Sequence, residues 1–181
     1  MNARISPSIA ADYAKATAYL RTSPTGARLV DAFEDTHAEL DPLLDHDFDD
    51  ATGVAWDRSR HQYDSPPVIS WNPHGAQGLR EGRESPALAL AHEMQHVLQY
   101  EKHETDGTDP HEPDWFDRAL GNYGEDEEDA ARVEARIARE LPDEPVRANY
   151  ADGTALKYVR TPITHSLNAT GRAARQKAKA A

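Results

Sequence analysis

The sequence predicts an α+β fold that is mostly helical and carries a small sheet. Several segments repeat apolar residues at helical spacing, whereas residues 67–71 form a short β-branched and aromatic run bounded by prolines. A length of 181 residues suits one domain with a substantial core. We therefore expect a single domain over residues 1–170, followed by a basic, disordered tail at 171–181.

The first part of the chain is expected to hold two helices. Residues 7–20 are rich in alanine and form an apolar stripe of Ile9, Tyr13, Ala16 and Leu20. Turn chemistry at 23–26 separates them from residues 27–40, which carry a second stripe of Leu29, Val30, Phe33, His37 and Leu40. The acidic segment 41–50 reads as a solvated connection, and we assign its histidine, His46, no chemistry.

The central part of the chain predicts a strand and then a long helix. Residues 67–71 are the expected strand, and 53–56 is a short candidate to pair with it. After a loop over 77–85, Ser85 can cap a helix with Pro86 in its first turn, running to about residue 100.

The last part predicts one more helix. The polar, turn-rich segment 101–114 reads as an exposed loop. Residues 125–141 show a buried stripe of Ala130, Val133, Ile137 and Leu141, and Pro142 ends this helix. Residues 146–159 read as short strands or loop.

Composition excludes several partners. Acidic residues outnumber basic ones by 32 to 20, and the resulting charge of -12 argues against nucleic acid or an anionic membrane as a partner. No apolar run reaches the roughly 20 residues that cross a bilayer, and the first ten residues lack the apolar stretch of a signal peptide. We expect a soluble protein that, if secreted, leaves its cell without a cleaved signal peptide.

The main chemical signal is the pair of histidines His92 and His96 on the third expected helix. Residues at i and i+4 share one helix face, so both rings can reach a single tetrahedral zinc ion. Glu93 between them is placed to act as the general base towards a zinc-bound water. Because the chain has no cysteine, any metal must be held by His, Asp or Glu.

A catalytic zinc ion takes a third protein ligand, and several residues compete for this role. The HExxHxxGxxH pattern is excluded, because Gln99 and Lys102 stand where glycine and histidine are required. Loop candidates are His103, Asp109 and His111. The acidic start of the helix at 125–141 offers Glu127 or Glu128, because a helix packed against the histidine helix can bring a glutamate to the metal.

Several segments together resemble a known family, the NleD-like effector metalloproteases, and more distantly the clostridial neurotoxin light chains. These segments are the Val-Ile-Ser-Trp-Asn-Pro run at 68–73, the HExxH helix, the pair Glu127 and Glu128, Glu134 beside the run 137–141, and the segment 146–150. The resemblance implies that Glu128 binds zinc with Glu127 beside it, and that Glu134 lies near the ligands. It also implies that Arg147 and Tyr150 stabilise charge at the scissile carbonyl.

The expected protein is a zincin-like metallopeptidase, with a small sheet beside the HExxH helix. The resemblance implies a zinc endopeptidase effector that acts in a host cell on a protein substrate such as a signalling kinase, and we expect it to be a monomer. Two alternatives share the sequence features: an antibacterial or housekeeping zinc hydrolase, and a non-enzymatic acidic interaction domain.

Overall fold

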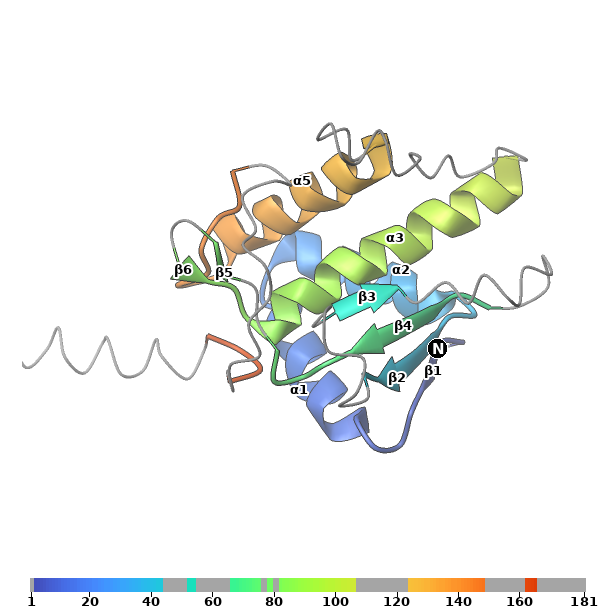
Figure 1. Ribbon diagram of the computed structural model, residues 1–181, viewed down its shortest axis with the longest axis horizontal. Helices are drawn as coiled ribbons and strands as arrows, with labels where there is room; N and C mark the ends of the chain where they lie inside the picture. Colours follow the sequence, from blue (N-terminus) through green and yellow to red (C-terminus); the bar gives the residue numbers. More distant parts are fainter. Residues whose placement is uncertain are drawn as a thin grey trace, which may run out of the picture.

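The computed structural model describes residues 2–43, 52–54, 66–75, 78–79, 82–106, 124–148 and 162–165. These residues have an α+β architecture (Figure 1). The helices are α1 (Ala10–Leu20), α2 (Pro24–Asp35), α3 (Pro86–Asp106) and α5 (Gly124–Glu140). The predicted fold class, α+β with predominant helix and small sheets, is therefore confirmed.

The larger sheet is short and mixed. Its strands are β1 (Arg4–Ile5), β2 (Glu39–Pro42), β3 (Thr52–Val54) and β4 (Val68–Trp71), in the order β1-β2-β4-β3. The pairs β1–β2 and β2–β4 are parallel, whereas β3 runs antiparallel to β4 at one edge. Two further strands, β5 (Gly78–Leu79) and β6 (Gly82–Arg83), form a separate antiparallel pair just before α3.

Helix α3 is the central element of the fold. It packs against α1, α2 and α5, and against β3 and β4 of the sheet (Figure 1). Its buried apolar residues are Ala87, Leu88, Ala89, Leu90, Ala91, Met94 and Val97. Apolar side chains surround the first part of this helix on most sides, so the polar groups buried there need a partner or a ligand.

The start of α3 is held in place by polar contacts. Ser85 Oγ accepts a hydrogen bond from Leu88 N at 3.1 Å, so the expected N-cap is present. Trp71 at the end of β4 donates from Nε1 to the Pro86 carbonyl at 3.0 Å. Glu144, after α5, accepts from Ser85 N at 3.1 Å and from the Tyr19 hydroxyl at 2.9 Å. Three separate segments therefore position the helix that carries the histidines.

The prediction of a helix over 27–40 was wrong at both ends. Helix α2 begins at Pro24, where Ser23 Oγ accepts a hydrogen bond from Gly26 N, and it ends at Asp35. Thr36 leaves the helix in an extended conformation, and its hydroxyl accepts from Ala38 N. Leu40 is then buried as part of β2, the strand that lies between β1 and β4 in the sheet and pairs with both. Pairing between distant strands, which a local pattern does not contain, overrode the helical spacing.

Other predicted elements match more closely. Strand β4 lies within the expected 67–71, β3 overlaps the candidate 53–56, and α5 matches 125–141 within a residue at each end. Helix α3 runs six residues past the expected end at 100, through part of the predicted loop, and stops at Asp106. The predicted loop at 77–85 contains β5 and β6. His46 and the expected tail 171–181 lie outside the described residues.

Across the described ranges, none of the helices is long and apolar enough to cross a membrane. Helix α3 has the required length, but it carries charged residues throughout its second half.

Glu140 at the end of α5 joins that helix to the start of α2. Its Oε2 accepts hydrogen bonds from Ser23 Oγ at 2.5 Å and Thr25 N at 2.8 Å, and its Oε1 accepts from Thr25 Oγ1 at 2.7 Å. The hydrogen bonds from Ser23 and Thr25 lower the pKa of Glu140 from 4.5 to about 2. A carboxylate in this position also suits the positive end of the α2 dipole.

We predict that Glu140→Gln lowers the Tm at neutral pH by a few degrees. A carboxyl group whose pKa is lower in the folded chain stabilises the fold above its unfolded pKa, and this stabilisation disappears as the pH falls through the folded pKa. The difference in Tm between wild type and variant should therefore shrink between pH 4.5 and about 2. Thermal unfolding across this pH range measures it.

Glu128→Gln is the matched control, because this side chain is exposed and pairs only with Arg132 among the contacts of the described residues. It should change the Tm little at any pH. A Glu140→Gln effect that stays constant down to about pH 2 would contradict the role assigned to this carboxylate.

Candidate functional site

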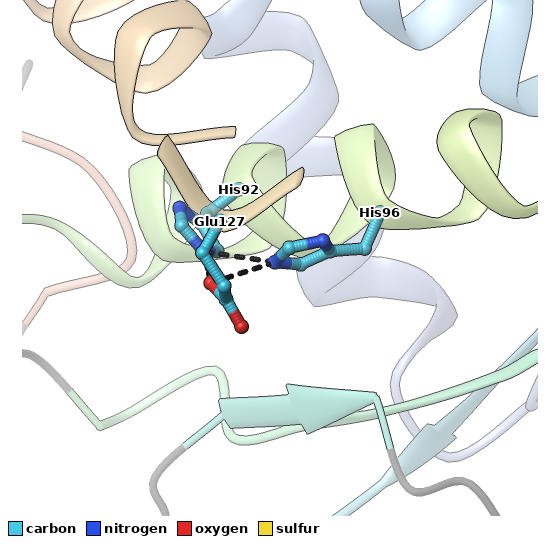
Figure 2. Close-up of side chains that lie close together, drawn as sticks. All are labelled: His92, His96 and Glu127. Carbon is cyan, nitrogen blue, oxygen red and sulfur yellow. Dashed lines mark hydrogen bonds and ion pairs between the residues drawn. The ribbon is translucent and has the colours of Figure 1, made fainter. Parts of the chain in front are cut away.

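Helices α3 and α5 lie side by side (Figure 1) and bring together three side chains that could hold a metal ion. His92 and His96 project from neighbouring turns of α3 towards one point, and Glu127 reaches that point from the first turn of α5 (Figure 2). Among the described His, Cys, Asp and Glu residues, these three form the group that could hold a metal ion. His92 is buried, and His96 and Glu127 are partly exposed, with side-chain exposures of 10%, 16% and 28% respectively.

The three facing atoms have the spacing of ligands around a tetrahedral ion. His92 Nε2 and His96 Nε2 are 3.1 Å apart, and Glu127 Oε2 lies 3.4 Å from the first and 3.2 Å from the second. Ligands bound tetrahedrally at about 2.0–2.1 Å from zinc lie about 3.3 Å from each other. The donor set of two imidazoles and one carboxylate also fits zinc, and it leaves one coordination position for another molecule.

The outer ring nitrogens of both histidines have partners that set their tautomers. His92 Nδ1 lies 3.0 Å from Glu134 Oε2, and His96 Nδ1 lies 2.9 Å from Gln99 Oε1. Both partners accept hydrogen bonds, so each Nδ1 carries the proton. In the neutral rings, each Nε2 then presents a lone pair to the shared point, as metal ligation requires.

The electrostatics of the group favour a positive charge at this point. Burial lowers the pKa of His92, but hydrogen bonds to Glu127 and Glu134 outweigh this effect and raise it from 6.5 to about 10. Burial raises the pKa of Glu127, and the hydrogen bonds from His92 and His96 then take it well below its usual 4.5. Either a proton on His92 or a metal ion can supply this positive charge, because the three facing atoms would otherwise present only lone pairs to one another.

A buried charged network continues behind His92. The side chain of Glu134 is 1% exposed. Its Oε2, the oxygen that faces His92, also forms an ion pair with Arg147 Nη1 at 3.3 Å. Glu84, 2% exposed, lies in the electrostatic range of Glu134 and Arg147. Burial raises the pKa of Glu84 well above its usual value and the charge of Glu134 raises it further, which favours its protonated form. A neutral Glu84 limits the negative charge in this part of the core.

The acidic pair at the start of α5 is arranged differently from the sequence-based expectation. Glu128 was expected at the metal and Glu127 beside it, whereas it is Glu127 that approaches the two histidines. The Glu128 side chain is 64% exposed and pairs with Arg132 at 3.0 Å. The two residues are consecutive on a helix, so their side chains diverge by about 100° and only one can face α3.

The other expected catalytic residues lie at different places. Glu93 follows His92 on α3, is 8% exposed, and is close enough for its charge to raise the pKa of His92. Arg147 was expected at the scissile carbonyl, but it is 5% exposed and its guanidinium contacts Glu134. Tyr150 lies outside the described residues, and so do the loop candidates Asp109, His111 and the side chain of His103.

Sequence reasoning missed Gln99 as a residue of the site. In the sequence, Gln99 stood out only because the HExxHxxGxxH pattern requires glycine at this position. It also lies three residues after His96 and seven after His92. These spacings place all three side chains on one helix face, which is the signal that could have identified it. Its partner on α5 is not visible in a local pattern.

Comparison with known protein families identifies the family of this chain. The family model Peptidase_M91, described as an effector protein, matches residues 6–137. This range includes His92, Glu93, His96, Glu127 and Glu134. No curated protein and no solved structure matches the chain. The match covers well over half of the 181 residues, and the chain therefore belongs to the Peptidase_M91 family of effector proteins.

Proposed function

We propose that this protein is a zinc-dependent endopeptidase with a zincin-like fold, in which His92, His96 and Glu127 hold the metal. The observation that carries the proposal is the convergence of their three ligand atoms at 3.1–3.4 Å from one another. Membership of a peptidase family supports the same reaction class. A mixed sheet with an antiparallel edge strand packed along the HExxH helix supports the fold assignment.

Zinc, when bound, supplies a Lewis acid and lowers the pKa of water towards about 7. Glu93 is the general base in this proposal, because it follows the first histidine and lies at the side of the ligand pair. Its carboxylate accepts the proton of the attacking water and passes it to the leaving amine. Glu134 and Gln99 orient the two histidine rings from behind.

Arg147 is proposed to act through Glu134. Its guanidinium lies 3.3 Å from Glu134 Oε2, the oxygen that also faces His92 Nδ1, and it therefore fixes the position of this buried side chain behind His92. Charge that develops on the scissile carbonyl would be stabilised by Tyr150, the other residue that the family resemblance indicates. These assignments give one residue a positioning role and the other a direct role.

A protein substrate would bind in an extended form beside β3. This strand lies at the edge of the sheet as the described residues form it, and it packs along α3, the helix that carries the histidines (Figure 2). Edge strands can pair with an extended peptide through backbone hydrogen bonds. Such pairing would place a peptide bond of the substrate beside the metal. It would depend little on the side chains of the substrate, because it uses main-chain hydrogen bonds.

Its family suggests an effector delivered into a host cell, and we propose a host protein as the substrate. A signalling kinase is the specific substrate class that the resemblance implies. The net charge of -12 favours a basic segment around the cleavage site. An unbiased survey of new N-termini in treated eukaryotic and bacterial lysates distinguishes an effector from a housekeeping or antibacterial hydrolase.

We predict that the dialysed wild-type protein contains about one zinc ion per chain. His96→Ala and Glu127→Ala should lose most of this zinc, because each removes one of three protein ligands. Glu128→Ala should retain it, because that side chain faces solvent. Elemental analysis after dialysis measures the content.

Glu128→Ala is the matched control for Glu127→Ala, because each variant removes one carboxylate from the same helical turn. Loss of zinc in the Glu128 variant alone would assign the ligand to Glu128, as the family resemblance implied. A folded wild-type protein that takes up no zinc even when it is supplied would overturn the peptidase proposal.

Glu93→Gln is predicted to keep both zinc and fold while losing peptidase activity by about 10²–10⁴-fold. The amide is nearly the same shape as the carboxylate, but it cannot accept the proton. New N-termini that appear in lysate with the wild type should be absent with the variant, which would contain the same amount of zinc. Cleavage that persists at the wild-type rate would rule out Glu93 as the base.

Tyr150→Phe is predicted to lower kcat by about 10²-fold without loss of zinc, as expected for one donor to a developing oxyanion. KM should change little, because the donor acts mainly in the transition state. Steady-state kinetics on a peptide from the identified cleavage site measures both constants. An unchanged kcat would assign this tyrosine a structural role.

A further inference from the structure

Gln99 connects the two helices that carry the metal site. It is 8% exposed on α3, and its side-chain amide touches one group on each helix. Its Oε1 lies 2.9 Å from His96 Nδ1, and its Nε2 donates to the Asp126 carbonyl of α5 at 2.8 Å. Both distances are those of well-formed hydrogen bonds.

The contact with α5 determines which way the amide points. A backbone carbonyl can only accept, so the group facing Asp126 O must be the NH₂ of the amide. The amide oxygen therefore faces His96, and His96 Nδ1 must be the donor. This leaves His96 Nε2 without a proton in the neutral ring and directs its lone pair towards Glu127 and His92.

The residue held on α5 is directly next to the third ligand. Asp126 immediately precedes Glu127, so the hydrogen bond from Gln99 restricts the α5 backbone at the position from which the Glu127 side chain departs. The orientation of His96 and the placement of Glu127 thus depend on the same amide group.

We propose that Gln99 is a positioning residue that pre-organises the His92–His96–Glu127 site before a metal binds. This inference rests on the metal site of the proposed function and assigns its assembly to one side chain. Metal affinity depends on how little the ligands must be reordered on binding. The neutral amide of Gln99 can orient His96 without adding a negative charge. A carboxylate in its place, comparable to Glu134 behind His92, would put a second negative charge beside the metal.

The chain provides a matched control in Gln95. Its amide also bridges α3 to α5, with Nε2 3.4 Å from Asp129 Oδ2, and it is partly buried. None of the hydrogen bonds found for it among the described residues reaches His92, His96 or the segment before Glu127. Replacing either glutamine by methionine removes one cross-helix amide and keeps a side chain of similar shape.

The test measures zinc affinity by competition with a chromophoric chelator, together with the visible spectrum of the cobalt-substituted protein. Gln99→Met should weaken zinc binding by about 10- to 100-fold and alter the cobalt spectrum, which reports ligand geometry. Gln95→Met should leave both close to wild type. Far-ultraviolet circular dichroism verifies that each variant is folded.

Gln99→Glu separates the two contacts of the amide. Its carboxylate still accepts from His96 Nδ1, but it cannot donate to the Asp126 carbonyl, so its affinity should fall between those of the wild type and Gln99→Met. An affinity no better than that of Gln99→Met would overturn the role at His96.

Two outcomes would overturn the inference as a whole. If folded Gln99→Met binds zinc as tightly as the wild type with the same cobalt spectrum, Gln99 does not position the ligands, and the metal site itself stands. If the wild type binds neither metal, both the metal site and the inference that rests on it fail.

Discussion

Two imidazole nitrogens and a carboxylate oxygen face one another at 3.1–3.4 Å between α3 and α5. Such an arrangement of lone pairs is stable only around a positive charge, because the atoms would otherwise repel one another in a partly desolvated site. Much of the surrounding structure serves this requirement. The caps, the Trp71 contact and Glu144 hold α3 in position, and Gln99 and Glu134 keep the ring protons on the far side of each histidine.

The two histidines are supported in different ways. His92 Nδ1 contacts a buried ion pair between Glu134 and Arg147. His96 Nδ1 instead contacts the neutral amide of Gln99, which also hydrogen-bonds to α5. Leaving a buried charge unpaired costs about 3–5 kcal/mol, so the pair behind His92 has a strong effect on stability as well as orientation. The Gln99 amide beside His96 adds no charge, and it links α3 to α5. The two arrangements together position both rings and the segment of α5 from which Glu127 extends.

The rest of the fold places the buried and polar faces of α3 against different neighbours. Apolar residues of α3 fill the core against α1, α2 and the sheet, while its polar face turns towards α5, with β3 at the edge of the sheet beside it. A long helix buried in this way would be unstable with unsatisfied polar groups. The polar side chains His92, His96 and Gln99 of this helix accordingly find partners on α5.

The amino-acid sequence alone determined the α+β class, the helix with His92, Glu93 and His96, and the helix that brings an acidic residue to them. These features follow from local periodicity, capping and i, i+4 spacing. Only the tertiary structure brought Glu127 rather than Glu128 to the histidines, directed Arg147 to Glu134, gave Gln99 its two partners and placed Leu40 in a strand. Each of these depends on the rotation of one helix against another or on pairing between distant segments, and a local pattern contains neither.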